Sequence, residues 1–148
     1  MSGFVGRAAE RVFDARKTFA YAPYDRLDFE LKVRAGGDVD ARLLVRMDEI
    51  RESLGILSQL LGRLGPGEIM ARRPSAAAGE GAALVEAFRG DVFMSVRIAA
   101  DGRLARVHAR DASWFQWPLL EAAVEGNIVA DFPLCNKSFN CSYSGHDL

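Results

Sequence analysis

The feature that most constrains the fold is a long apolar seam between residues 38 and 67. Asp38 or Asp40 can cap the start of a helix here, and the Gly-Pro-Gly run at 65–67 ends it. The seam predicts either a core helix or a surface that docks on another chain or on a missing part of this one. Its members recur at alternating spacings of four and three residues, as on one face of an amphipathic helix: Leu43, Met47, Ile50, Leu54, Leu57, Leu61 and Leu64.

A second pattern, in residues 27–34, has the period of a β-strand. Apolar residues alternate there with charged ones, at Leu27, Phe29, Leu31 and Val33. We therefore expect a half-buried strand that stops at the two glycines of 36–37. The preceding residues, 7–21, favour a short polar helix or an irregular arm.

Residues 90–110 predict a β-hairpin whose turn lies at 100–102. The segment before it, 74–83, is rich in small residues and favours a loop. One face of the first hairpin strand is apolar, with Val92, Met94, Val96 and Ile98.

Residues 113–127 predict a second helix, with Pro118 in its first turn and Gly126 at its C-terminal end. The remaining residues, 128–148, are apolar and then irregular. The order of elements predicts an α+β fold in a single domain over residues 1–148. That fold consists of a long amphipathic helix, a β-hairpin or small antiparallel sheet, a second helix and an irregular C-terminal tail.

The composition excludes several classes of function. The 148 residues carry a net charge of −1, which argues against a nucleic acid partner because phosphate binding needs clustered Lys and Arg. No apolar run reaches the ~20 residues needed to cross a bilayer, and the N-terminus lacks the features of a secretory signal. We expect a cytoplasmic protein with reduced thiols.

The two cysteines do not have the spacing of a metal site. Cys135 and Cys141 are separated by five residues, whereas structural zinc and Fe–S sites usually bring cysteines as closely spaced pairs. Even with His146 and His108 the chain offers few soft ligands, so we predict no bound metal. The sequence also lacks the motifs of phosphate loops, dinucleotide sites and zinc proteases.

Arginines gather around the predicted hairpin. The stretch "EAFRGD" places Glu86, Arg89 and Asp91 at its entry. An arginine beside a glycine could point into a cleft there, although a structural ion pair is the simpler interpretation. A basic face on the hairpin could hold an anion, but such faces are more often solvated or paired with carboxylates: Arg97, Arg106, His108 and Arg110.

Six segments, in order and covering nearly the whole chain, resemble one known family. The resemblance is to the C-terminal part of the large subunit of group 4 nickel–iron hydrogenases, of the formate hydrogenlyase and hydrogenase-4 type. The 49 kDa subunit of respiratory complex I is homologous to them. The segments are "GFVGRA", "DARKTFAYAPYDRLDFELKV", "GDVDARLLVRMDEIRESLGILSQLL", "VEAFRGD", "RVHARDASWFQWPLLEAAVEGNIVADFPLCNKSF" and "SYSGHD".

Departures from the family pattern concern the metal ligands. Family hydrogenases bind nickel and iron with four cysteines, in one pair near each end of the large subunit. This chain begins about where the second half of the family would begin, so the first pair is missing. Aligning the shared Tyr-Ser places Ser142 and Gly145 at the second pair, with Cys141 one position out and Cys135 upstream. The resemblance implies a relic of a metal site, because a serine alcohol is a poor nickel ligand and glycine has no side chain.

The resemblance also implies a role in electron transfer. It implies a small-subunit partner that carries an Fe–S cluster, membrane subunits, and a quinone or another acceptor near that interface. The chain would lie on the cytoplasmic side of the inner membrane, held through its partners, would bind no cofactor itself and would have no turnover in isolation. Around the former active-site cavity we expect Arg89, Glu86, Ser138, Ser142, Gly145 and His146.

Two other classes of function stay open at the level of sequence. The chain could be a non-catalytic structural or assembly subunit that docks through the seam of Leu43, Met47, Ile50, Leu54, Leu57 and Leu61. It could instead be a small-anion or nucleotide-binding protein that uses Arg89 and the basic face of the hairpin. Exposure of the seam would favour an obligate partner.

Overall fold

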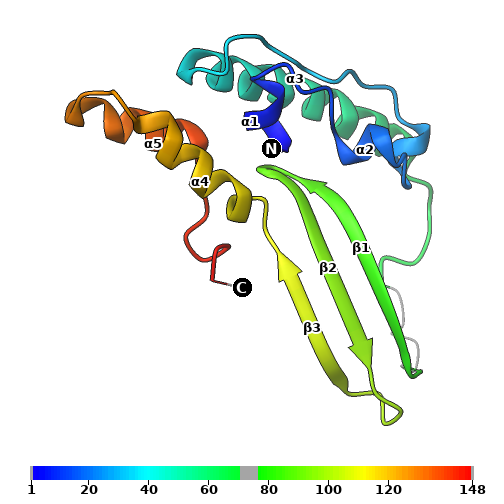
Figure 1. Ribbon diagram of the computed structural model, residues 1–148. Coiled ribbons are helices and arrows are strands. Elements are labelled where there is room, and N and C mark those ends of the chain that lie inside the picture. The colour runs from blue at the N-terminus through cyan, green and yellow to red at the C-terminus, as the bar shows by residue number, and fades with distance from the viewer. Residues whose placement is uncertain (1, 71–76, 148) are drawn as a thin grey trace.

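The computed structural model describes residues 2–70 and 77–147 and confirms the α+β class (Figure 1). Helices gather at one end, and a three-stranded sheet extends away from them. The elements in chain order are α1 Gly3–Arg7, α2 Ala15–Thr18, η1 Tyr24–Arg26, α3 Val39–Arg63, β1 Gly79–Ala87, β2 Gly90–Ile98, β3 Leu104–Arg110, α4 Ser113–Val124, η2 Val129–Asp131 and α5 Phe132–Phe139.

The predicted long helix is confirmed as α3, which has 25 residues. Asp38 caps it, because its carboxylate accepts a hydrogen bond from the backbone N–H of Ala41 at 2.8 Å. One side of α3 is buried through Val45 and Ile56. The apolar seam lies on its uncovered side, where the seven residues are 44–80% exposed. The seam is therefore not part of the core of this chain.

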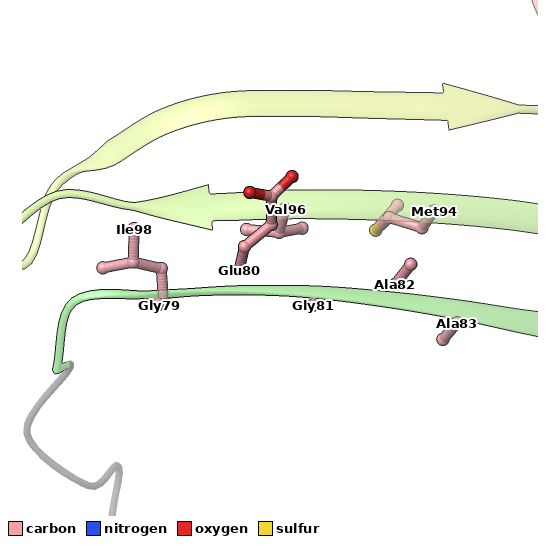
Figure 2. A pocket seen from close by; sticks show the side chains of 8 residues that line it. All are labelled: Gly79, Glu80, Gly81, Ala82, Ala83, Met94, Val96 and Ile98. Atoms are coloured by element: carbon pink, nitrogen blue, oxygen red, sulfur yellow. The ribbon is translucent and has the colours of Figure 1, made fainter.

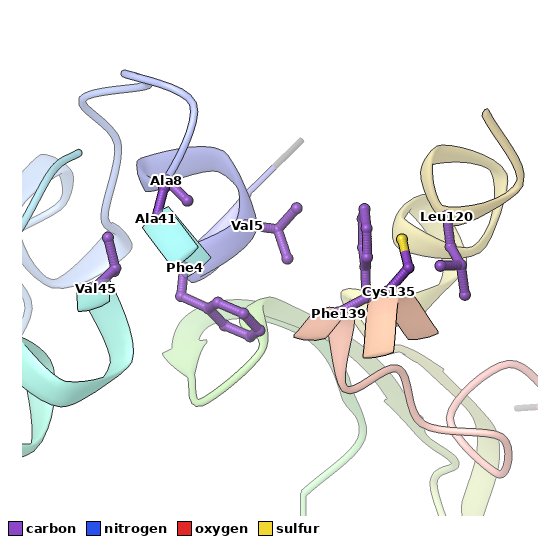
Figure 3. Packing of buried hydrophobic residues seen from close by; sticks show 8 residues of the cluster. All are labelled: Phe4, Val5, Ala8, Ala41, Val45, Leu120, Cys135 and Phe139. Carbon is purple, nitrogen blue, oxygen red and sulfur yellow. The ribbon is translucent and has the colours of Figure 1, made fainter. Parts of the chain in front are cut away.

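The main core lies where four helices meet (Figure 3). Helix α1 contributes Phe4, Val5 and Ala8 at its end, and α3 contributes its first turns. The other side comes from α4 and α5, which bring together segments distant in the sequence. The buried cluster consists of Phe4, Val5, Ala8, Ala41, Val45, Leu120, Cys135 and Phe139. Helix α1 is therefore part of the core, and the segment 7–21 contains the short helix α2 between irregular residues.

The sheet is antiparallel, in the order β1-β2-β3. The predicted hairpin is confirmed as β2 and β3, with Val96 opposite Val107. Strand β1 was not predicted, because residues 79–83 were expected to form part of a loop. Glycine and alanine have low strand propensity, but the pairing of β1 along the whole of β2 overrides it. Residues 74–76 of that expected loop lie outside the described residues.

The strand predicted at 27–34 does not form, because this segment pairs with none of the described strands. The segment is extended, and Leu27 and Phe29 are buried as the alternation required. It runs along α3 instead of joining the sheet: Asp28 N–H donates to Gln59 Oε1 at 2.9 Å, and Glu30 N–H donates to Glu52 Oε2 at 3.0 Å. Helix side chains thus replace the backbone groups of a neighbouring strand.

Two predictions for the C-terminal third need correction. Pro118 lies inside α4 and not in its first turn, because the helix begins at Ser113. Gly126 follows the end of α4 with φ +77°, as a helix C-terminus favours. The tail is not irregular throughout, since α5 forms one of its segments and ends at Asn140 in the left-handed conformation. Burial of Cys135 and Phe139 against the core favours this helix.

Candidate functional site

The tail returns to the start of α4 and is fixed there by side chains. Ser142 N–H donates to Ser113 Oγ at 2.9 Å, and Trp117 Nε1 donates to the carbonyl of Ser142 at 3.3 Å. Within the tail, Gly145 N–H donates to Ser142 Oγ at 3.0 Å. Ser142 and Gly145, which the resemblance aligns with the family's second cysteine pair, therefore lie in a loop that is bound to α4.

Gly145 has no room for a side chain. An added Cβ would lie 2.9 Å from Asp111 Cγ and 3.0 Å from Asp111 Oδ1. Asp111 itself is fixed, because its Oδ1 accepts a hydrogen bond from Ser113 N–H at 2.8 Å. The Asp111 carboxylate thus occupies the space that a cysteine at position 145 would need.

Arg89 lies in the turn between β1 and β2 and faces the same loop. Its Nε donates to the carbonyl of Asn140 at 2.6 Å, and its own carbonyl accepts from Gln116 Nε2 at 2.7 Å. The turn is held against α1 by a close backbone contact, since a Cβ at Gly3, which has φ +63°, would lie 2.1 Å from the Arg89 carbonyl oxygen. Among the described residues, no carboxylate pairs with Arg89, so the ion pair expected for it does not form.

The thiol of Cys141 lies in this site as a neutral group. Its sulfur is 3.9 Å from Gln116 Oε1. Burial raises the pKa of Cys141 to about 11, with the positive charge of Arg89 opposing that rise and the negative charge of Asp111 adding to it. With no metal bound, this thiol is therefore protonated near neutral pH. Within residues 2–70 and 77–147, no group of three His, Cys, Asp or Glu is placed to hold a metal ion.

The structure brings only some of the expected cavity residues together. Ser142 and Gly145 lie in the loop at the start of α4, and Arg89 contacts the adjoining Asn140 from the turn between β1 and β2. Ser138 lies elsewhere, between α3 and α5, where its hydroxyl accepts from Arg42 Nε at 2.9 Å and donates to the carbonyl of Cys135. His146 is exposed in the tail. Glu86 belongs to a separate buried cluster.

That buried cluster is centred on Arg7, which is 1% exposed. Arg7 Nη1 donates to Glu86 Oε1 at 3.0 Å, and Nη2 donates to Glu49 Oε1. Beside it, Asp14 and Arg16 form a two-point ion pair, with Nη2 to Oδ2 at 2.6 Å and Nε to Oδ1 at 2.9 Å. Sequence reasoning missed this cluster, because its members come from four elements and no short-range spacing links them.

The basic face of the hairpin is partly neutralised. Arg110 Nη2 pairs with Asp91 Oδ2 at 2.5 Å. The His108 ring lies between the rings of Phe93 and Trp114, at centroid distances of 6.3 and 6.0 Å. The sheet also has an apolar hollow at its far end, lined by β1 and β2 (Figure 2). Neither feature gathers polar groups around one point, as a small-anion site would require.

Comparison with known proteins assigns the chain to a family. A profile described as "Respiratory-chain NADH dehydrogenase, 49 Kd subunit" matches residues 1–78, a little over half of the chain. The chain belongs to this family. A carbon monoxide-induced hydrogenase of Rhodospirillum rubrum is 33% identical over 95% of this chain and 39% of its own length. A subunit of the NADH-quinone oxidoreductase of Acidothermus cellulolyticus is 32% identical over 88% of this chain and 40% of its own length.

The chain also resembles a solved structure. The whole chain superposes on 42% of a chain in the membrane-bound sulfane sulfur reductase, an archaeal respiratory membrane complex, with a TM-score of 0.90 and 32% identity. The chain thus spans about 40% of the length of these three relatives. In the part of the chain that the structure describes, no helix is both long and apolar enough to cross a membrane.

Proposed function

We propose that the chain is a large-subunit component of a membrane-associated redox complex, in which the nickel–iron cysteine ligands have been lost and electrons pass to a quinone or a similar acceptor. The observation that carries this proposal is the overlap at Gly145. Family membership supplies the redox context. The lack of space beside Asp111 supports loss of the ligand, because the site would have to be rebuilt before a thiolate could enter it.

Arg89 is the residue that we expect to act on the acceptor. Its Nε is used by the Asn140 carbonyl, whereas no described residue accepts a hydrogen bond from its terminal nitrogens. The guanidinium therefore keeps donors for a negatively charged group at the start of α4. A guanidinium in this position would stabilise the negative charge that develops on an acceptor when the acceptor is reduced.

The exposed seam on α3 supports a docking role. The relatives carry more than half of their length outside the region that matches this chain. We propose that the remainder of the large-subunit fold covers the seam, supplied by the same polypeptide or by a second one. Seven large apolar side chains on one helix face form the kind of patch that obligate contacts bury: Leu43, Met47, Ile50, Leu54, Leu57, Leu61 and Leu64.

The other partners follow from the proposed role. An Fe–S cluster in a small subunit would deliver electrons, and membrane subunits would hold the assembly at the cytoplasmic face of the inner membrane. This chain would bind no cofactor of its own. Electron transfer would be coupled to proton movement, without hydrogen chemistry at nickel.

Co-purification tests this function. The tagged chain would be isolated from its host in mild detergent, as wild type and as Leu54→Asp, with Leu104→Asp as the matched control on exposed strand β3. We expect the wild type and the control to recover an Fe–S subunit and membrane subunits, and Leu54→Asp to lose them. Recovery of the wild-type chain without redox subunits would contradict the proposal.

A purely structural role in the same complex is the second candidate, and the exposed seam favours it equally. Arg89→Gln separates the two, with Arg97→Gln on β2 as the control. If Arg89 faces the acceptor, Arg89→Gln lowers quinone reduction by the assembled complex while Arg97→Gln does not. Unchanged turnover in a fully assembled Arg89→Gln complex would support the structural role.

A further inference from the structure

The Arg7 cluster brings more carboxylates than guanidinium groups into direct contact. The ion pair of Asp14 with Arg16 is neutral by itself, because each oxygen of the carboxylate meets the guanidinium. Arg7 is then left to neutralise both Glu49 and Glu86. One guanidinium carries one positive charge and can neutralise one carboxylate. A second buried carboxylate beside the same guanidinium is therefore more stable when it is protonated and neutral.

Hydrogen bonding distinguishes the two glutamates. Both oxygens of Glu86 accept N–H groups, Oε1 from Arg7 at 3.0 Å and Oε2 from the backbone of Ala15 at 3.0 Å. Only one oxygen of Glu49 does so, and no described residue donates to its Oε2. The Glu86 side chain is 3% exposed, and that of Glu49 is 18% exposed. Glu49 therefore has both a free oxygen and a path to solvent.

A polar cavity of about 270 Å³ lies beside these groups, lined in part by Arg7, Glu49, Ser53 and Glu86. Arg7 Nε is buried and has no hydrogen-bond partner among the described residues. Buried polar atoms of this kind are usually bonded to water, and the cavity is large enough to hold several water molecules. Water in the cavity would reach both this atom and Glu49 Oε2.

The other charged and titratable groups that line the cavity are Arg16, Arg46 and Tyr24, and the positive charge of Arg16 opposes the effect of burial on the pKa of Glu49. Arg46 lies on α3 one turn before Glu49, and its guanidinium stacks over Phe4 and Phe88 at 5.5 and 5.2 Å. Among the described residues, Arg46 forms no ion pair with either glutamate. Tyr21 accepts the backbone N–H of Glu86 through its hydroxyl, and Tyr24 lines the cavity.

We propose that Glu49 carries a proton at neutral pH, and that Glu49, Arg7 and Glu86 form a proton-binding site that opens on this cavity. The Glu49 carboxylate takes the proton from water in the cavity and returns it to that water. No electron moves in this step. Burial raises the pKa of both Glu49 and Glu86, which agrees with the geometry. The inference goes beyond the proposed redox function and does not depend on it, because the isolated chain would hold the proton.

Infrared spectroscopy of the isolated chain tests the site without any substitution. We expect the band of a protonated carboxylic acid at pH 7, and we expect ¹³C-labelled glutamate to shift it, which assigns it to Glu rather than to Asp. Glu49→Gln should remove the band. Absence of the band from the wild type would overturn the proposal, and so would a band that persists in Glu49→Gln.

Unfolding as a function of pH gives a second readout. Because the folded chain holds a proton that the unfolded chain releases above the ordinary glutamate value of 4.5, stability falls as pH rises from 4.5 through the folded pKa of Glu49. In that window the unfolding equilibrium constant of the wild type rises by up to about tenfold per pH unit. Glu49→Gln should flatten this dependence.

Glu52, one turn further along α3, is the matched control. A backbone hydrogen bond from Glu30 and the side-chain bond from Lys32 lower the pKa of Glu52, so it is ionised at neutral pH. Glu52→Gln should keep the infrared band and the pH dependence above 4.5. Equal behaviour of the Glu49→Gln and Glu52→Gln variants would overturn the proposal.

Discussion

Substitution of Gly145 by alanine should destabilise the chain, and Asp111 should be the reason. The new Cβ would lie 2.9 Å from Asp111 Cγ, closer than carbon atoms pack. Overpacking of this kind costs about 1–3 kcal/mol. If Asp111 swings away instead, its hydrogen bond to Ser113 N–H is lost, which costs about 1 kcal/mol or more. With either response we expect a cost of about 1–3 kcal/mol.

Urea unfolding of the isolated chain would measure this change in the free energy of unfolding. In a chain of this size 1 kcal/mol corresponds to about 2–4 °C in Tm, so a thermal scan should show a shift of roughly 2–12 °C. Gly55→Ala is the matched control, because nothing lies within 4 Å of its added Cβ. Alanine is the better helix former, so this control should gain up to about 1 kcal/mol.

A double-mutant cycle isolates the contact with Asp111. The three atoms nearest to the new Cβ all belong to the Asp111 side chain, and Asp111→Gly removes them. In the Asp111→Gly background Gly145→Ala should cost less than about 1 kcal/mol, because the free-energy changes of substitutions at two residues in direct contact are not additive. An equal cost in both backgrounds, or no cost at all, would refute the claim that Asp111 closes the former ligand position.

Three further predictions concern other parts of the chain. Gly3→Ala should cost about 3 kcal/mol or more in urea unfolding, because its Cβ would overlap the Arg89 carbonyl and its φ is +63°. The thiol of Cys141, whose pKa is raised to about 11, should react slowly with iodoacetamide at pH 8 and faster as pH approaches 11. Asp14 should lose its stabilising contribution as pH falls below 3.8. Burial acts to raise the pKa of Asp14, but the contact with Arg16 outweighs burial and lowers it. Acid unfolding curves should show a smaller loss of stability in Asp14→Asn than in the wild type.

Local periodicity predicted the elements that carry a strong pattern. The spacing of the seam predicted α3, and alternation with a turn signal predicted β2 and β3. The same alternation misassigned residues 27–34, because a period of two reports an extended backbone and not the identity of its neighbour. Strand β1 was missed because its Gly and Ala residues have low strand propensity and its pairing with β2 decides its structure.

The resemblance supplied the candidate site, because it aligns Ser142 and Gly145 with the family's second cysteine pair, and that alignment stays a prediction. No sequence pattern predicted that Asp111 fills the space beside Gly145. The Arg7 cluster escaped prediction for a related reason. Arg7 meets Glu49 and Glu86 across 42 and 79 residues of sequence, and such contacts depend on the complete tertiary fold.

A metal count on the purified native complex tests the central claim most directly. The complex would be isolated through this chain in mild detergent, and iron and nickel would be measured per copy of the chain in the same sample. The account predicts iron from a partner's Fe–S cluster and no nickel. Nickel at one atom per chain would contradict it, because a working nickel–iron site would then exist despite Ser142 and Gly145.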